Sequence, residues 1–180
     1  MNNTRIHTYP HMSNSAFLIK NCHGTIIRQC PIYSRLVSSI QSGCFQHRYK
    51  LGIQCSRSKN LIDQFSTLSN AALCLNKSLF DDTFSVTVYR AMWDIPDLVQ
   101  SLDHPTPFST TLSLNFALQW LTLRSQCIVL VFSLKRHHPF VVLDEESEEE
   151  IVLAPGVLSI ESVYVVDDIR FAKCSYTPHN

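Results

Sequence analysis

One ten-residue stretch decides the fold: SEEEIVLAPG, residues 147–156. Its glutamates lead into an apolar segment from Glu150 to Leu153 that predicts a buried strand, and Pro155-Gly156 predicts the turn that ends it. In a β-type segment, side chains two positions apart face the same side, so Glu148 and Glu150 are expected to point into one site. A run of glutamates is more often a solvated loop, so the rest of the chain has to support this interpretation.

The segments around this stretch predict a mixed domain. Apolar residues at helical spacing predict a helix over residues 60–80, and the alternating, β-branched segment 83–90 predicts a strand. The near-continuous apolar run from Cys127 to Leu134 is typical of a buried strand. The remaining expected elements are helices near 33–42, 95–102 and 114–124, and extended segments at 108–111, 140–143, 158–167 and 169–175. A helical first half followed by a mostly β second half predicts the α+β class.

Two further signals precede the glutamates. Arg90 closes the strand 83–90, and Ser109-Thr110-Thr111 follows Pro107. An arginine can bind phosphate oxygens through two N–H groups at once, and a serine hydroxyl can hold a ribose and a carboxylate in register. Alone, an arginine at a strand end is usually a solvated edge charge, and a Ser-Thr-Thr segment is usually a turn or helix cap. Their order along the chain, ahead of the glutamates, indicates one shared site.

Together the three signals resemble the arginine-specific mono-ADP-ribosyltransferases, over roughly residues 60–175. That family carries an Arg on one strand, a Ser-Thr-Ser-type strand, and a Glu-x-Glu that opens a later strand. Arg90, Ser109-Thr110-Thr111 and Glu148-Glu149-Glu150 match these features in order, with Thr111 in place of the usual final serine. The resemblance implies an ADP-ribosyltransferase-like α+β fold: two small, roughly perpendicular β-sheets around an NAD cleft, with flanking helices from the first half.

The resemblance also implies a reaction: NAD or NADP is the co-substrate, no metal is needed, and ADP-ribose passes to an arginine of a target protein as nicotinamide leaves. Glu150 would be the catalytic carboxylate, because cleavage of the nicotinamide–ribose bond builds positive charge on the sugar, which a neighbouring carboxylate stabilises. The residues to which the resemblance assigns NAD binding are Arg90, Ser109, Thr110 and Tyr89.

Glu148 bears on the choice of acceptor. A second carboxylate can pair with an incoming guanidinium and help to remove its proton. Family members with Glu at the first position of Glu-x-Glu tend to modify arginine, whereas Gln there goes with other acceptors. Three neighbouring acids, Glu145, Glu146 and Glu149, are alternative partners for the guanidinium, and the register is open by one residue.

Two other functions stay open. An NAD glycohydrolase would use the same site with water as the acceptor. A catalytically inactive relative would act as a binding module, an interpretation that Thr111 and the unusual first 60 residues keep open. A nucleic-acid partner is not expected, because the basic first segment lacks interleaved aromatic residues.

The formal net charge of zero hides an uneven distribution. Residues 1–60 contain no Asp or Glu, whereas residues 144–150 hold six of the fifteen acids. We therefore expect a basic, acid-free, partly irregular N-terminal extension at 1–58 and an ADP-ribosyltransferase catalytic domain at 59–180. The seven cysteines show no zinc-site spacing and favour a soluble intracellular protein, with secretion or organelle targeting as alternatives. No apolar run approaches the ~20 residues that cross a bilayer.

The remaining residues with chemical potential receive ordinary interpretations. His137-His138 is expected to be a solvent-exposed pair, and no third ligand near it suggests a metal. Trp93 and Trp120 are expected in the core or in a pocket wall. With four glycines and no glycine fingerprint, the chain is not expected to hold a Rossmann or P-loop site.

Overall fold

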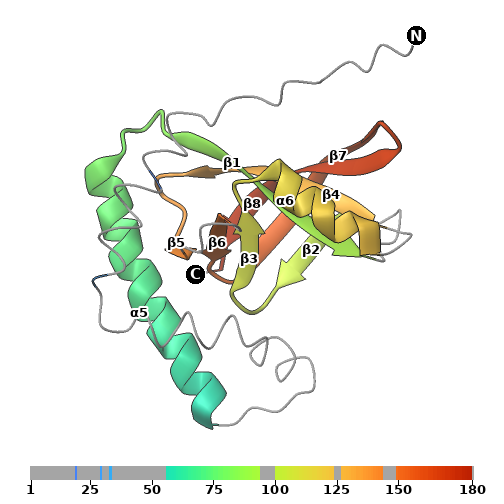
Figure 1. Ribbon diagram of the computed structural model, residues 1–180. Helices are drawn as coiled ribbons and strands as arrows, with labels where there is room; N and C mark the ends of the chain where they lie inside the picture. Colours follow the sequence, from blue (N-terminus) through green and yellow to red (C-terminus); the bar gives the residue numbers. More distant parts are fainter. Residues whose placement is uncertain are drawn as a thin grey trace.

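The computed structural model describes residues 56–93, 100–123, 127–143 and 149–179, together with Ile19, Gln29 and Tyr33 (Figure 1). The acidic residues 144–148, including Glu148, lie outside this description. The helix expected near 33–42 also lies outside it, apart from Tyr33.

Helix α5 spans Ser56–Leu79 and begins four residues before the helix that the sequence predicts. It lies on the side of the molecule that carries β5 and β6 (Figure 1). Its apolar residues Phe65, Leu68 and Ala72 are buried in one cluster with Val141 and Val152. Helical spacing places these three side chains on one face of α5, and this apolar face packs against the sheet.

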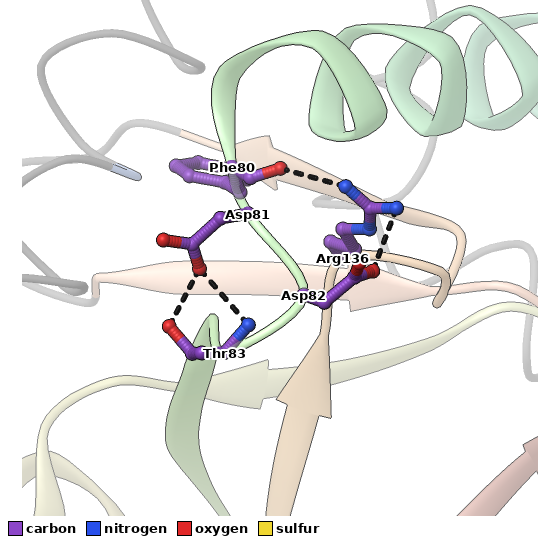
Figure 2. A network of polar contacts seen from close by, with 5 residues as sticks. All are labelled: Phe80, Asp81, Asp82, Thr83 and Arg136. Carbon is purple, nitrogen blue, oxygen red and sulfur yellow. Dashed lines mark hydrogen bonds and ion pairs between the residues drawn. The ribbon is translucent and has the colours of Figure 1, made fainter.

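Polar contacts fix the connection between α5 and the first strand (Figure 2). Asp81 Oδ1 accepts hydrogen bonds from the backbone N–H of Thr83 at 2.9 Å and from its hydroxyl at 2.6 Å. Arg136 Nη2 pairs with Asp82 Oδ1 at 2.6 Å, and its Nη1 donates to the carbonyl oxygen of Phe80 at 3.3 Å. The connection between α5 and β1 is therefore tied to the residue that follows β4.

The described strands form one sheet in the order β2-β7-β8-β4-β1-β3-β6-β5. All neighbouring pairs are antiparallel except β4 and β8, which are parallel. The bounds of the strands in chain order are β1 Ser85–Trp93, β2 Ser101–His104, β3 Phe108–Thr111, β4 Cys127–Lys135, β5 Phe140–Leu143, β6 Glu150–Leu153, β7 Gly156–Val166 and β8 Ile169–Pro178.

The sheet divides into two limbs at the contact between β1 and β3. Nine residue pairs join β1 to β4, whereas the pair Tyr89↔Thr111 joins β1 to β3. A five-stranded limb (β2, β7, β8, β4, β1) thus meets a three-stranded limb (β3, β6, β5), and β3 runs in a different direction from β1 in Figure 1. The sequence predicts two small, roughly perpendicular sheets, whereas the described strands form two limbs of one sheet that is continuous through the pair Tyr89↔Thr111.

Both limbs contribute to one apolar core. Val88 and Leu130 from the five-stranded limb are buried in the same cluster as Phe140 and Leu153 from the three-stranded limb. Residues of the expected N-terminal extension reach the folded part as well: Ile19 is buried in this cluster, and the Tyr33 hydroxyl donates to the carbonyl oxygen of Val142 at 3.1 Å. Helix α5 runs across position 58, where the sequence places the boundary between extension and domain.

A short helix follows β3 and precedes β4 in the chain. Helix α6 spans Leu114–Gln119 and continues as the 3-10 helix η2, Trp120–Leu123. Ser113 caps it, because its Oγ accepts a hydrogen bond from the Phe116 N–H at 3.2 Å. This confirms the helix predicted near 114–124.

Two expectations from the sequence are wrong, and one alternative for a third is excluded. The end of the helix expected over 95–102 is a strand, because Ser101 and Leu102 pair with Ser159 and Leu158 of β7; residues 94–99 lie outside the description. Trp93 and Trp120 are not in the core, since 36% and 43% of their surfaces are exposed, and the alternative of a pocket wall stays a prediction. His138 is buried rather than solvent-exposed, because its Nδ1 accepts a hydrogen bond from Lys135 N–H at 3.2 Å and its ring packs on Tyr176.

Candidate functional site

Arg90 lies near the end of β1 and points toward the three-stranded limb. It has the strand parity of the buried Val86 and Val88, so alternation directs its side chain to the core face. Its Nη1 donates a hydrogen bond to the carbonyl oxygen of Ser109 on β3. Burial lowers the pKa of Arg90 to about 10, while the nearby charge of Glu150 acts in the opposite direction. The guanidinium therefore stays charged at neutral pH and lies within electrostatic reach of the proposed catalytic carboxylate.

Phe108 and His104 form an aromatic pair beside Arg90 that the sequence analysis does not single out. The guanidinium carbon lies 5.5 Å from the centroid of the Phe108 ring, and the His104 ring stacks on Phe108 at 4.2 Å. Burial, with the charge of Arg90 as the second cause, lowers the pKa of His104 to about 4, so its imidazole is neutral. Sequence reasoning missed His104 because β2 itself was missed.

Two polar atoms of this cluster are buried without a hydrogen-bond partner among the described residues: Arg90 Nε and His104 Nε2. A buried guanidinium donor with nothing to bind carries a desolvation cost that a bound anion would remove. The donor set therefore fits a phosphate oxygen, the group that NAD would bring.

The segment Ser109-Thr110-Thr111 is part of β3, as predicted, and β3 lies between β1 and β6. Ser109 is half-buried and pairs with Val152, and Thr111 pairs with Glu150. The Thr110 hydroxyl donates to the carbonyl oxygen of Ile151 at 2.9 Å in a buried contact, which ties β3 to β6. The geometry of Thr110 thus favours support of the strand over direct contact with NAD.

Glu150 is the first residue of β6, at the predicted position. It is half-buried and pairs with Thr111 on one side and with Leu143 on the other. Its position across β3 from β1 explains how the carboxylate acts on Arg90 although the two residues are 60 positions apart in the chain.

The residue before it corrects one premise of the sequence interpretation. Glu149 has a backbone φ of 47°, which is left-handed and not extended. The alternation argument that placed Glu148 and Glu150 on one side therefore does not apply across Glu149. Glu148 itself lies outside the described residues.

Tyr89 is half-buried beside Arg90 and provides the pairing of β1 with β3. Burial raises the pKa of its hydroxyl, and Tyr164 of β7 contributes in the same direction. Tyr89, Arg90, Ser109 and Glu150 thus lie on three neighbouring strands, β1, β3 and β6, with the side chains of Tyr89 and Arg90 on opposite faces of β1. The part of the chain that is described holds no cluster of three or more metal-ligating side chains and no helix long and apolar enough to cross a membrane.

Solved structures superpose on this chain over nearly its whole length. Plx2a, an ADP-ribosyltransferase toxin from Paenibacillus larvae, aligns with a TM-score of 0.62 at 12% identity, over 90% of this chain and 94% of its own. The ADP-ribosyltransferase Vis from Vibrio splendidus, solved in complex with agmatine, aligns with a TM-score of 0.60 at 13% identity, over 94% and 88%. The chain has the ADP-ribosyltransferase fold.

C3stau2 from S. aureus, solved with NAD, gives a TM-score of 0.66 at 12% identity over 96% of this chain and 99% of its own. No family model matches the sequence, and no curated protein matches it. The chain thus shares the ADP-ribosyltransferase fold with proteins that are 12–13% identical to it in sequence. The predicted α+β fold class is confirmed.

Proposed function

We propose that this protein is a mono-ADP-ribosyltransferase that moves ADP-ribose from NAD to an arginine of a target protein. One observation carries the proposal: Arg90 and Glu150 lie within electrostatic reach of one another across β3, in a chain with the ADP-ribosyltransferase fold. A cation for the pyrophosphate and a carboxylate for the reacting ribose are the two charges that this reaction needs.

In this proposal Arg90 binds the pyrophosphate, with its buried Nε as a donor, and Tyr89 lies beside it on β1. Ser109 holds the nicotinamide-side ribose, and Thr110 contributes through the strand that carries Ser109. Glu150 stabilises the positive charge that forms on that ribose. The bond between ribose C1′ and nicotinamide breaks with its electron pair going to nicotinamide, and a guanidine nitrogen of the acceptor forms the new bond to C1′ and loses a proton.

The choice of arginine as the acceptor rests on Glu148 and on one comparison. A carboxylate at position 148 can pair with a guanidinium and take its proton. Vis was solved with agmatine, which carries the guanidinium group of arginine. Both observations support an arginine-bearing protein as the partner, with NAD as the co-substrate and no metal.

Labelled NAD and a mixture of arginine-rich proteins test the proposal. We expect label on arginine with the parent protein and at least a roughly tenfold loss with Glu150→Gln, because a charge beside the reacting sugar contributes several kcal/mol. Glu161→Gln is the matched control, since Glu161 is an exposed acid of β7 that pairs with Lys173 at 3.2 Å. Equal labelling by the parent and Glu150→Gln would remove the catalytic role.

Nicotinamide release separates the proposed transferase from an NAD glycohydrolase. A glycohydrolase releases nicotinamide without labelling protein, whereas the transferase releases one nicotinamide for each label. We expect Glu148→Gln to retain nicotinamide release and to lose labelling of arginine. Loss of both would show that Glu148 acts on NAD rather than on the acceptor.

A further inference from the structure

We propose that Glu149 is a positioning residue whose left-handed backbone sets the direction in which Glu150 starts β6. The inference concerns the site of the proposed transferase and rests on that function for its kinetic consequence. It assigns the role to the backbone of Glu149 and not to its carboxylate.

The backbone conformation is unusual for this residue type. Three non-glycine residues of the described chain have positive φ: Glu149 at 47°, Asp167 at 49° and Asp168 at 64°. The two aspartates form the turn between β7 and β8, where Asp tolerates the left-handed region well. Glutamate has no such preference, so the surrounding structure must hold Glu149 in this conformation.

The structure holds Glu149 at its carbonyl group and at the residue that follows it. The Leu112 N–H, just past the end of β3, donates to the carbonyl oxygen of Glu149 at 3.1 Å. The next residue, Glu150, is already paired with Thr111 of β3 and with Leu143 of β5. The chain therefore turns at Glu149 and is in register one residue later.

This geometry has a consequence for the carboxylate of Glu150. If residue 149 were extended, the carbonyl oxygen would point away from Leu112 and the first residue of β6 would change its direction. A misplacement of about 1 Å at a reacting group costs roughly a hundredfold in rate. Arg90 hydrogen-bonds to Ser109 on β3, so its position does not depend on this turn.

Two uncharged substitutions of Glu149 distinguish the effect of its backbone conformation from the effect of its carboxylate. Glycine adopts the left-handed region without strain, whereas valine strongly disfavours it. We expect Glu149→Val to have a kcat for nicotinamide release at least about tenfold below that of Glu149→Gly, with the KM for NAD of the two variants within about twofold. A kcat that is equally low in both variants would assign the role to the carboxylate and overturn the proposal.

Asp167 provides the matched control for strain. Asp167→Val places the same side chain at a left-handed position of the β7–β8 turn. We expect it to lower the unfolding temperature, as Glu149→Val does, while its kcat stays near that of the parent. A similar fall in kcat for Asp167→Val would mean that general destabilisation explains the effect.

Hydrogen exchange at Leu112 tests the geometry without any activity. We expect the Leu112 amide to be protected in the parent and in Glu149→Gly, and to exchange at least about tenfold faster in Glu149→Val, because the bond to the Glu149 carbonyl is lost. Unchanged protection in Glu149→Val overturns the proposal. A parent that shows this protection pattern but neither cleaves NAD nor labels protein would contradict the proposed function and leave the backbone role of Glu149 supported.

Discussion

The guanidinium of Arg90 and the backbone carbonyl of Ser109 are hydrogen-bonded across the junction of the two limbs. This contact supplements the pair Tyr89↔Thr111 at the place where β1 and β3 meet. It commits one end of the guanidinium to the fold and leaves Nε buried without a partner among the described residues. Arg90 therefore holds the junction, and its buried Nε is the donor that the proposed function assigns to the pyrophosphate.

Replacement of Arg90 by lysine tests the second of these tasks. A lysine keeps the charge but cannot donate from several nitrogens in one plane. Loss of one hydrogen bond to a charged group costs about 1.5–3 kcal/mol, so we expect the KM for NAD of Arg90→Lys to rise roughly tenfold to a hundredfold. Steady-state kinetics at varied NAD measure this.

Arg136→Lys is the control for that experiment. Arg136 is also hydrogen-bonded to a carbonyl and paired with a carboxylate, but it follows β4 and contacts the connection between α5 and β1 (Figure 2). Its variant should leave the KM for NAD unchanged. If Arg90→Lys binds NAD as the parent does, Arg90 does not contact the pyrophosphate.

The adjacent histidines 137 and 138 predict a pH dependence of stability. Burial lowers the pKa of His138 to about 4, with the charges of His137 and Lys135 as further causes. Between pH 6.5 and pH 4 the unfolded chain binds more protons at this residue than the folded chain does, so stability falls as the pH falls through this window. We expect the unfolding temperature to drop from pH 7 to pH 5.

His138→Gln should reduce this drop, because it removes the buried group whose pKa is lowered. His104, whose pKa is also lowered to about 4, accounts for part of the remaining slope. Thermal unfolding followed by circular dichroism at several pH values gives the pH dependence of the unfolding temperature for the parent and for His138→Gln. Equal slopes for the parent and His138→Gln would show that His138 is not buried in its neutral form.

Gly156 tests the packing at the end of the deciding stretch. A Cβ at this position would lie 2.5 Å from the carbonyl oxygen of Thr177 and 2.6 Å from a ring carbon of Tyr176. Both neighbours belong to β8, so we expect Gly156→Ala to lower the free energy of unfolding by about 1–3 kcal/mol. Chemical denaturation measures this free energy of unfolding, and Ser159→Ala on the exposed face of β7 is the control. A loss of less than about 0.5 kcal/mol for Gly156→Ala would contradict the close packing.

The strands that carry the motifs were predictable because local signals bound them on both sides. Pro107 and the capping Ser113 enclose β3, and the glutamates and Pro155-Gly156 enclose β6, so both strands have the expected bounds. β2 was not predictable in this way. Its partner, β7, is more than 50 positions away in the chain, and four alternating residues carry too little periodicity to exclude a helix.

The details that the sequence could not provide depend on tertiary contacts. The left-handed backbone of Glu149 goes with the hydrogen bond from Leu112 and with the pairing of Glu150 to β3 and β5. Glutamate as a residue type does not predict this conformation. The burial of His138 depends on Tyr176 and Lys135, of which Tyr176 is remote in the chain. The placement of Arg90 within electrostatic reach of Glu150 follows from the order of the strands, which the motifs alone do not specify.

The position of β8 has a consequence for biosynthesis. Residues 169–178 lie inside the sheet, between β7 and β4, and pair in parallel with β4. A ribosome delivers these residues after the other described strands, so the edge of β4 that faces β8 stays unpaired until they emerge. The nascent polypeptide therefore completes the described sheet only after β8 has been translated.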